Sequence, residues 1–131
     1  ASPNDMVGLR LWVDENRVIT TRERDIDAIE GMKLLVKGRT GPQTSGEFLT
    51  KLFEKIYADI EPHIEELEDS IADLDEQVSR GEIKQACSSL AETGHSAVVF
   101  LRHLSPQKNV LDTLIGSGIH FLSARDVERL M

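Results

Sequence analysis

The feature that most constrains the fold is a repeat between residues 44 and 118, in which mostly apolar residues recur alternately three and four positions apart. We call these positions the seam, because they would form the line of contact between two helices. In the first half these positions are Phe53, Tyr57, Ile60, Ile64, Leu67, Ile71, Leu74 and Val78. In the second half they are Ile83, Cys87, Leu90, Gly94, Ala97, Leu101, Leu104, Lys108, Leu111 and Ile115. This heptad spacing predicts two long helices. Because only Ser79-Arg80-Gly81-Glu82 separates them, we expect an antiparallel pair.

The seam predicts which residues of the two helices meet. Counted outward from the turn, Val78 should meet Ile83 and Leu74 should meet Cys87, which we therefore expect to be a small buried side chain. Further along, Gly94 should let the two backbones approach closely. Proline at position 62 should kink the first helix without ending it, since the periodicity continues beyond it.

Short signals mark where the helices begin and end. Thr44 followed by Glu47 forms a capping box for the first long helix. The glycines of Gly116-Ser117-Gly118 end the second, and Ser123 with Asp126 opens a further helix. Before the pair, Asp25 should cap a short helix over residues 26–37 that stops at Gly38.

The first part of the chain reads as a β-hairpin. Leu9, Leu11 and Val13 alternate with Arg10 and Trp12, and residues 18–21 are all β-branched. The four residues between them form the loop, where Asn16 can take the left-handed conformation. Because a lone two-stranded hairpin is marginally stable in water, we expect it to belong to a larger sheet or to lie on helices.

These signals together predict an α+β chain that is predominantly helical. We expect a hairpin and short helix over residues 1–43, a long acidic helical hairpin over 44–118, and the start of another helix over 119–131. The sequence opens almost directly on the strand pattern and closes on a helix start, so we expect it to be a piece of a longer protein. No apolar run approaches the roughly 20 residues that span a bilayer, so the piece itself should be soluble.

Negative charge is concentrated on the first long helix. Residues 47–76 hold eleven acidic residues against Lys51 and Lys55, whereas the whole chain has a net charge of −8. Such a surface attracts cations or basic surfaces and repels the phosphates of nucleic acids and anionic lipids. The alternative is that the acids only keep the chain soluble.

Two sets of side chains are candidate cation sites. Three acids recur beside the seam, at Glu61, Glu68 and Asp75. Oxygen ligands of this kind suit hard divalent cations such as Mg²⁺ held weakly through water. A second set, Asp59, His63 and Glu66, shares one helical face and suits a borderline metal such as Zn²⁺. Solvated side chains are the alternative for both sets, and no firmly bound cofactor is expected.

No constellation for catalysis appears. The serines near His95 lie on a predicted helix without a strained nucleophile turn, and Cys87 occupies a seam position. A single cysteine also excludes an intramolecular disulfide and fits a reducing compartment. We therefore expect a protein that is not an enzyme.

The sequence resembles the cytosolic domain of the CorA family of metal-ion transporters, most closely its zinc-transporter (ZntB) branch. The resemblance rests on segments in the family's order: residues 9–15, residues 17–22, Gly41-Pro42 with residues 47–49, residues 64–69, and Leu101-Arg102-His103-Leu104-Ser105-Pro106-Gln107-Lys108. The last segment is the most specific. The branch usually has two arginines where this chain has Arg102-His103, and an arginine in place of Lys108. The resemblance implies that these three residues form an anion site or a subunit contact.

The resemblance implies a larger assembly. Members of the family have a mixed α/β/α domain, whose sheet would include this hairpin, and a stalk, two membrane helices and a Gly-Met-Asn loop. They assemble as homopentamers, with this domain on the cytoplasmic side of the inner membrane. The resemblance also implies transport of zinc or magnesium that the cytosolic domain regulates. Contact with the membrane would be made only through helices outside this sequence. The alternative from another class is a free-standing acidic helical hairpin that docks a basic protein.

Overall fold

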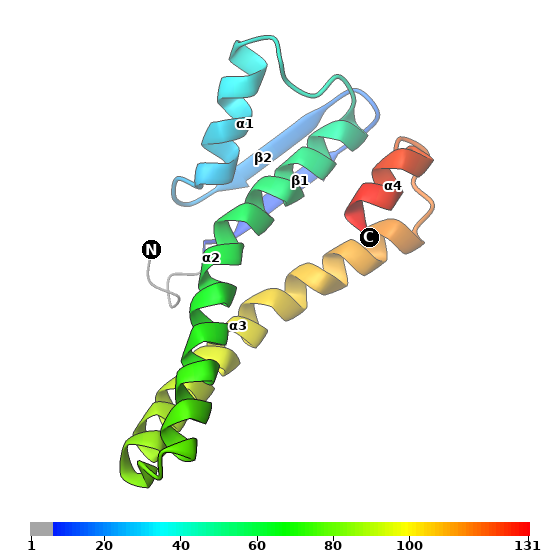
Figure 1. Cartoon of the computed structure of the whole chain (residues 1–131). Coiled ribbons are helices and arrows are strands. Elements are labelled where there is room, and N and C mark those ends of the chain that lie inside the picture. Colours follow the sequence, from blue (N-terminus) through cyan, green and yellow to red (C-terminus); the bar gives the residue numbers. More distant parts are fainter. Residues whose placement is uncertain (1–6) are drawn as a thin grey trace. The chain divides into compact units, whose positions relative to one another are not determined.

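The computed structural model describes residues 7–131, which form two strands and four helices (Figure 1). In chain order they are β1 (Leu9–Val13), β2 (Val18–Arg22), α1 (Asp27–Lys37), α2 (Ser45–Ser79), α3 (Ile83–Gly116) and α4 (Ala124–Leu130). The predicted class, a hairpin followed by a short helix and a long antiparallel helix pair, is confirmed. The chain divides into two compact units, residues 7–59 with 108–131 and residues 60–107, which are described separately. The functional division at residues 43 and 118 stays a prediction.

The β-hairpin has the expected strands and a different turn chemistry. Strand β1 pairs antiparallel with β2 from Leu9 opposite Arg22 to Val13 opposite Val18. Oδ1 of Asp14 accepts hydrogen bonds from the backbone N–H groups of Asn16 (2.8 Å) and Arg17 (2.7 Å). The bond from Asn16 is the main reason that the pKa of Asp14 lies below its ordinary value. The expected left-handed Asn16 is wrong, because among the described non-glycine residues only Arg39 has a positive φ; the aspartate side chain organises the turn instead.

The core of the first unit lies between the hairpin and two helices. Its fully buried cluster is Ala28, Ile29 and Met32 from α1 with Leu52 from α2. Side chains from β1, α1 and α2 pack around it, namely Leu9, Leu11, Ile26, Leu35, Phe48 and Ile56. The alternation of β1 therefore puts its leucines on the helix-covered face, as a period of two residues requires.

The inner face of β2 is covered less completely. A cavity of about 280 Å³ lies beside it, lined mostly by apolar side chains: Val18, Thr20, Ile29, Met32, Lys33, Val36, Lys37 and Phe48. Two strands are few for an independent sheet. Of the two expected arrangements, the structure shows the hairpin lying on helices α1 and α2, whereas a larger sheet stays a prediction.

Helix α1 begins without the cap that the sequence predicted. Its N-cap is Ile26, in extended conformation with no side-chain cap. The predicted cap by Asp25 is wrong, because its carboxylate pairs instead with the guanidinium of Arg22 at 2.8 Å. A charged partner offers Asp25 a stronger hydrogen bond than a neutral backbone N–H. The helix ends before Gly38, as predicted.

Helix α2 begins with part of the predicted capping box. The hydroxyl of Thr44 accepts from the backbone N–H of Glu47 at 3.1 Å. The carboxylate of Glu47 accepts from the N–H of Gln43 at 2.8 Å, one residue before the expected donor. The helix then runs through Pro62 to Ser79, as the continuous periodicity predicted. Helix α3 likewise runs through Pro106 and ends at Gly116.

Helix α4 is fastened to the first turn of α2. Ser123 and Asp126 form the predicted capping box, and Asp126 is buried. The carboxylate of Asp126 lies so close to Gly46 that a Cβ atom there would be 2.9 Å from its Cγ. A negative charge at this position is favoured by the positive end of the α2 dipole. An ion pair between Arg129 and Glu54 adds a second attachment.

The second unit is an antiparallel pair formed by residues 60–79 of α2 and 83–107 of α3 (Figure 1). Gly81 makes the turn with φ of +78°, a conformation that glycine adopts without strain. The ring centroids of His63 and Phe100 lie 6.1 Å apart. Nearer the turn, Oγ of Ser89 donates to Oε1 of Gln77 at 3.0 Å.

The line of contact between these helices agrees only in part with the predicted seam, of which Ile64, Leu67, Leu74, Ala97 and Leu104 are half-buried. Several predicted seam residues are exposed: Ile71, Val78, Ile83, Cys87, Leu90, Gly94 and Leu101. Less exposed positions include His63, Ser70 and Gln77 on α2, with Ala86 and Ser89 on α3. Small side chains permit close backbone approach, and Gln77 and Ser89 satisfy one another's polar groups. The predicted burial of Cys87 is therefore wrong. The predicted contacts of Val78 with Ile83 and of Leu74 with Cys87 stay predictions.

Gly94 also has a different role from the one predicted. A Cβ atom built on it would meet nothing within 4 Å. Close helix approach therefore does not depend on this glycine.

Outside this pair, Tyr57 is another predicted seam residue that is exposed. None of the helices in the described part of the chain has the combined length and apolar character that crossing a bilayer requires.

The contact at Gly46 leads to a stability prediction. Gly46→Ala should lower the free energy of unfolding by about 1–3 kcal/mol, because the added methyl overpacks a site closed by Asp126 and the carbonyl of Phe121. The matched change Gly94→Ala should raise stability by about 0.5–1 kcal/mol, since it removes a flexible residue from an open helical position. Urea unfolding followed by circular dichroism measures both. Equal effects of the two changes would show that α4 is not closely packed on α2.

Candidate functional site

Three acids form an exposed row along α2 in the helical hairpin. We call Glu61, Glu68 and Asp75 the acidic row; all three are exposed. None makes an ion pair or hydrogen bond within residues 7–131. The structure thus places these sequence-predicted residues on one side of one helix and leaves their charge without a basic neighbour in that range.

The spacing of the acidic row limits what it can bind. Seven residues correspond to about 10.5 Å of helical rise, so neighbouring carboxylates of the row are too far apart to share one ion. In the part of the chain that the structure describes, no group of three or more His, Cys, Asp or Glu side chains is arranged to hold a metal ion. The row can attract hydrated cations through its field, which salt would screen.

The second predicted set is only partly brought together. Nδ1 of His63 lies 3.6 Å from Oε2 of Glu66, one helical turn away. His63 also stacks against Phe100 of α3, so its ring belongs to the contact between the helices. Asp59 is exposed and belongs to the other compact unit. A metal held by these residues stays a prediction.

The bases singled out by the resemblance lie in different surroundings. Arg102 is exposed and makes no ion pair among the described residues, whereas His103 is half-buried. Lys108 forms an ion pair with Asp112 at 2.5 Å, within the other unit. Of the three, Arg102 is therefore the base whose charge is available to another molecule, and the predicted anion site or subunit contact stays untested.

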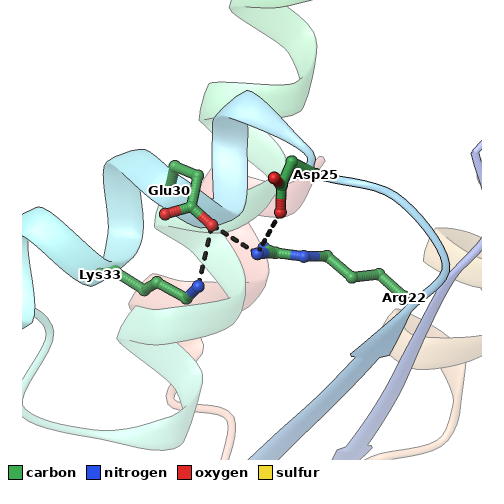
Figure 2. Close-up of polar contacts among 4 residues, drawn as sticks. All are labelled: Arg22, Asp25, Glu30 and Lys33. Carbon is green, nitrogen blue, oxygen red and sulfur yellow. Dashed lines mark hydrogen bonds and ion pairs between the residues drawn. The ribbon is translucent and has the colours of Figure 1, made fainter.

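The most connected polar cluster is one that the sequence did not single out. Figure 2 shows Arg22 at the end of β2 reaching toward Asp25 and Glu30, with Lys33 on the other side of Glu30. The side chain of Arg22 is only 17% exposed. Its Nη2 bonds both carboxylates, while Nη1 is buried without a hydrogen-bond partner in the described residues. The cluster joins β2 to α1.

Strand alternation could have revealed this cluster. Val18, Thr20 and Arg22 share one face of β2, so a period of two residues already directs Arg22 toward the helices. A buried guanidinium requires acidic partners. Glu30, one turn into α1, is the acid that reaches it. Its link to Arg22 depends on how α1 crosses the hairpin, which the sequence pattern does not specify.

Comparison with protein families gives a match along nearly the whole chain. The family described as "CorA-like Mg2+ transporter protein" matches residues 1–130. The match therefore includes both compact units as well as residues that the structure does not describe. It covers the hairpin and the acidic row together.

Individual relatives are zinc transport proteins. Zinc transport protein ZntB of Yersinia enterocolitica (serotype O:8 / biotype 1B) is 25% identical over 130 residues, or 99% of this chain and 39% of the relative. ZntB of Enterobacter sp. (strain 638) is 28% identical over 121 residues, or 92% and 37%. ZntB of Pectobacterium atrosepticum is 26% identical over 130 residues, or 99% and 39%. The chain thus spans about two-fifths of the length of these relatives.

The cluster around Arg22 generates a prediction about pH. Hydrogen bonds from Lys33 and Arg22 lower the pKa of Glu30 below its ordinary value of 4.5. A carboxylate with a lowered pKa in the folded state stabilises the fold above its ordinary pKa, and this contribution is lost as the pH falls through the lowered value. Glu30→Gln should therefore make the thermal midpoint decline less steeply than wild type as the pH is lowered below about 4.5.

The control for this prediction is Glu23→Gln. Glu23 is exposed and makes no ion pair among the described residues, so its variant should follow the wild-type curve. Thermal melts monitored by circular dichroism at several acidic pH values give the slopes. Parallel curves for wild type and Glu30→Gln would show that the cluster does not contribute to acid sensitivity.

Proposed function

Because this chain belongs to the family of CorA-like Mg²⁺ transporter proteins, we propose that it is the cytosolic, regulatory part of a divalent-cation transporter. The observation that carries the proposal is the family match over residues 1–130. The similarity to zinc transport proteins over 92–99% of the chain supports it. Family members are transporters, so an enzymatic role has no support here.

Zinc is the cargo that we propose, ahead of magnesium. The relatives described above are named for zinc transport, whereas the family as a whole is described by magnesium. The whole transporter would be a homopentamer in the inner membrane, with this chain on the cytoplasmic side and the membrane helices in other parts of the protein. The alternative of a free-standing interaction module gains no support from these relatives.

The acidic row supplies a physical role for this part of such a transporter. Its three unpaired carboxylates create a negative potential that raises the local concentration of divalent cations. Because the carboxylates lie about 10.5 Å apart along the helix, they attract ions without holding them in a closed cage. Weak, rapidly reversible attraction suits a surface that responds to the cation concentration around it. Zn²⁺ or Mg²⁺ would be bound there only weakly.

Transport itself is tested on the complete protein. Reconstituted in lipid vesicles, the protein that contains this chain should carry Zn²⁺ across the membrane, as reported by a zinc-sensitive dye trapped inside. Vesicles without protein give the background leak. Transport of Mg²⁺ without Zn²⁺ would contradict the proposed cargo, and the absence of both fluxes would contradict the proposed function.

The role of the acidic row is tested on the chain described here. Mg²⁺ or Zn²⁺ should raise its stability more than NaCl of equal ionic strength, because bound cations relieve repulsion among the carboxylates. A cation at about five times its Kd would add about 1 kcal/mol. Replacing Glu61, Glu68 and Asp75 by lysine should remove the increment that is specific to divalent ions. Thermal melts measure it.

A matched variant separates the row from the overall charge. Replacing Glu65, Asp69 and Asp73 by lysine makes the same change in charge on another side of α2, where all three residues are exposed. This variant should keep the divalent increment. If both variants lose it equally, the effect comes from net charge alone; if wild type lacks it, the row has no cation-sensing role.

A further inference from the structure

Each of the two long helices contains a proline within its length. Helix α2 runs through Pro62 and helix α3 runs through Pro106, and both helices continue without a break in Figure 1. Because a proline has no backbone N–H, the carbonyl groups four residues earlier, those of Ala58 and Arg102, receive no helical hydrogen bond from it. The proline ring also pushes against that carbonyl group, and helices bend at such positions. Each long helix therefore has one point at which its backbone is weakened.

Both prolines lie where a long helix passes from one compact unit to the other. The boundary falls between residues 59 and 60 in α2 and between residues 107 and 108 in α3. Pro62 is thus the third residue of the second unit along α2, and Pro106 is the last but one along α3. Each helix that connects the two units is therefore weakened close to the point of connection.

The side chains near the boundary provide little packing that would hold a fixed bend. Within these two described helices, no residue of α2 after Leu52 and no residue of α3 after Val99 is buried. Both prolines are exposed, as are the two residues whose carbonyl groups they leave without a helical bond. Water can therefore bond these carbonyl groups whatever the bend of the helix. Few buried contacts and solvated backbone groups are features of segments that move.

Within the second unit, the two helices are joined to one another. The ring centroids of His63 and Phe100 lie 6.1 Å apart. Nearer the turn at Gly81, Oγ of Ser89 donates to Oε1 of Gln77 at 3.0 Å. The first contact lies next to the proline of α2 and the second lies near the turn, so the pair is held together at both ends. A bend in one helix alone would pull these contacts apart, and the two helices must therefore bend together.

We propose that the two prolines form a double hinge, about which the second unit swings as one body. Residues 60–79 rise about 30 Å along α2, so a change of about 20° in the bend moves the turn by about 10 Å. The second unit holds ten acidic residues against three basic ones, which is −7 of the net charge of −8, and it includes the whole acidic row. The hinge therefore moves most of the charge of the chain. It depends on the two helices alone and not on the proposed transport function.

Distances between two spin labels test the hinge on the chain described here. One label is attached to Cys87, the single cysteine, which is exposed in the second unit. The other is attached at Leu34→Cys, an exposed position on α1 of the first unit. Double electron–electron resonance should give a broad distribution of distances, because the bend varies. Replacing Pro62 and Pro106 together by alanine should narrow the distribution about twofold or more, since alanine restores the missing hydrogen bonds and favours the helix.

Two controls complete the test. Asp69→Ala with Ser105→Ala changes one exposed residue of each helix and keeps both prolines, so the distribution should stay as broad as before. Labels at Cys87 and at Glu65→Cys both lie in the second unit and should give a narrow distribution, because that unit moves as one body. A narrow distribution between the two units with both prolines present overturns the proposal. So does an unchanged width after both prolines are replaced, equal narrowing in the control variant, or a broad distribution within the second unit.

Discussion

Burial along helix α2 is the constraint on which the rest of the structure depends. Its first turns place Leu52, with no exposed area, against α1 and the β-hairpin, and this burial positions the strands. The same first turn receives Asp126 at Gly46, which fixes α4. Beyond Pro62 the helix continues as one arm of the helical hairpin. A single continuous helix therefore contributes to both compact units and displays the acidic row.

Charge in this protein is handled in two contrasting ways. Around Arg22, charges are partly buried and paired, so they connect β2 to α1 and depend on one another. Along the acidic row, charges are exposed and unpaired, so each contributes little to stability and adds to a field that acts on other molecules. In the function proposed above, this field attracts divalent cations, which respond to it more strongly than monovalent ions.

Much of the fold followed from local signals. The strands, the turn at Gly81, the cap of α4 at Ser123 and the end of α3 at Gly116 appear where the sequence predicted them. Each depends on a preference of one residue or its near neighbours, such as glycine at positive φ. The position of the acidic row could also be predicted from the sequence, because a spacing of seven residues puts side chains on one side of any helix. The predicted helix cap by Asp25 was wrong because the guanidinium of Arg22, rather than the backbone of α1, binds its carboxylate.

The sequence by itself determined that residues 45–116 form two antiparallel helices, because their periodicity and the short turn allow no other pairing of such lengths. Only the tertiary structure decided which line of each helix faces the other. Rotating a helix by about 40° preserves its periodicity and its caps, so local signals do not distinguish the two orientations. Packing of Ala86 and the bond between Gln77 and Ser89 accompany the observed one. That choice leaves Ile71 and Leu90, two residues of the predicted seam, exposed.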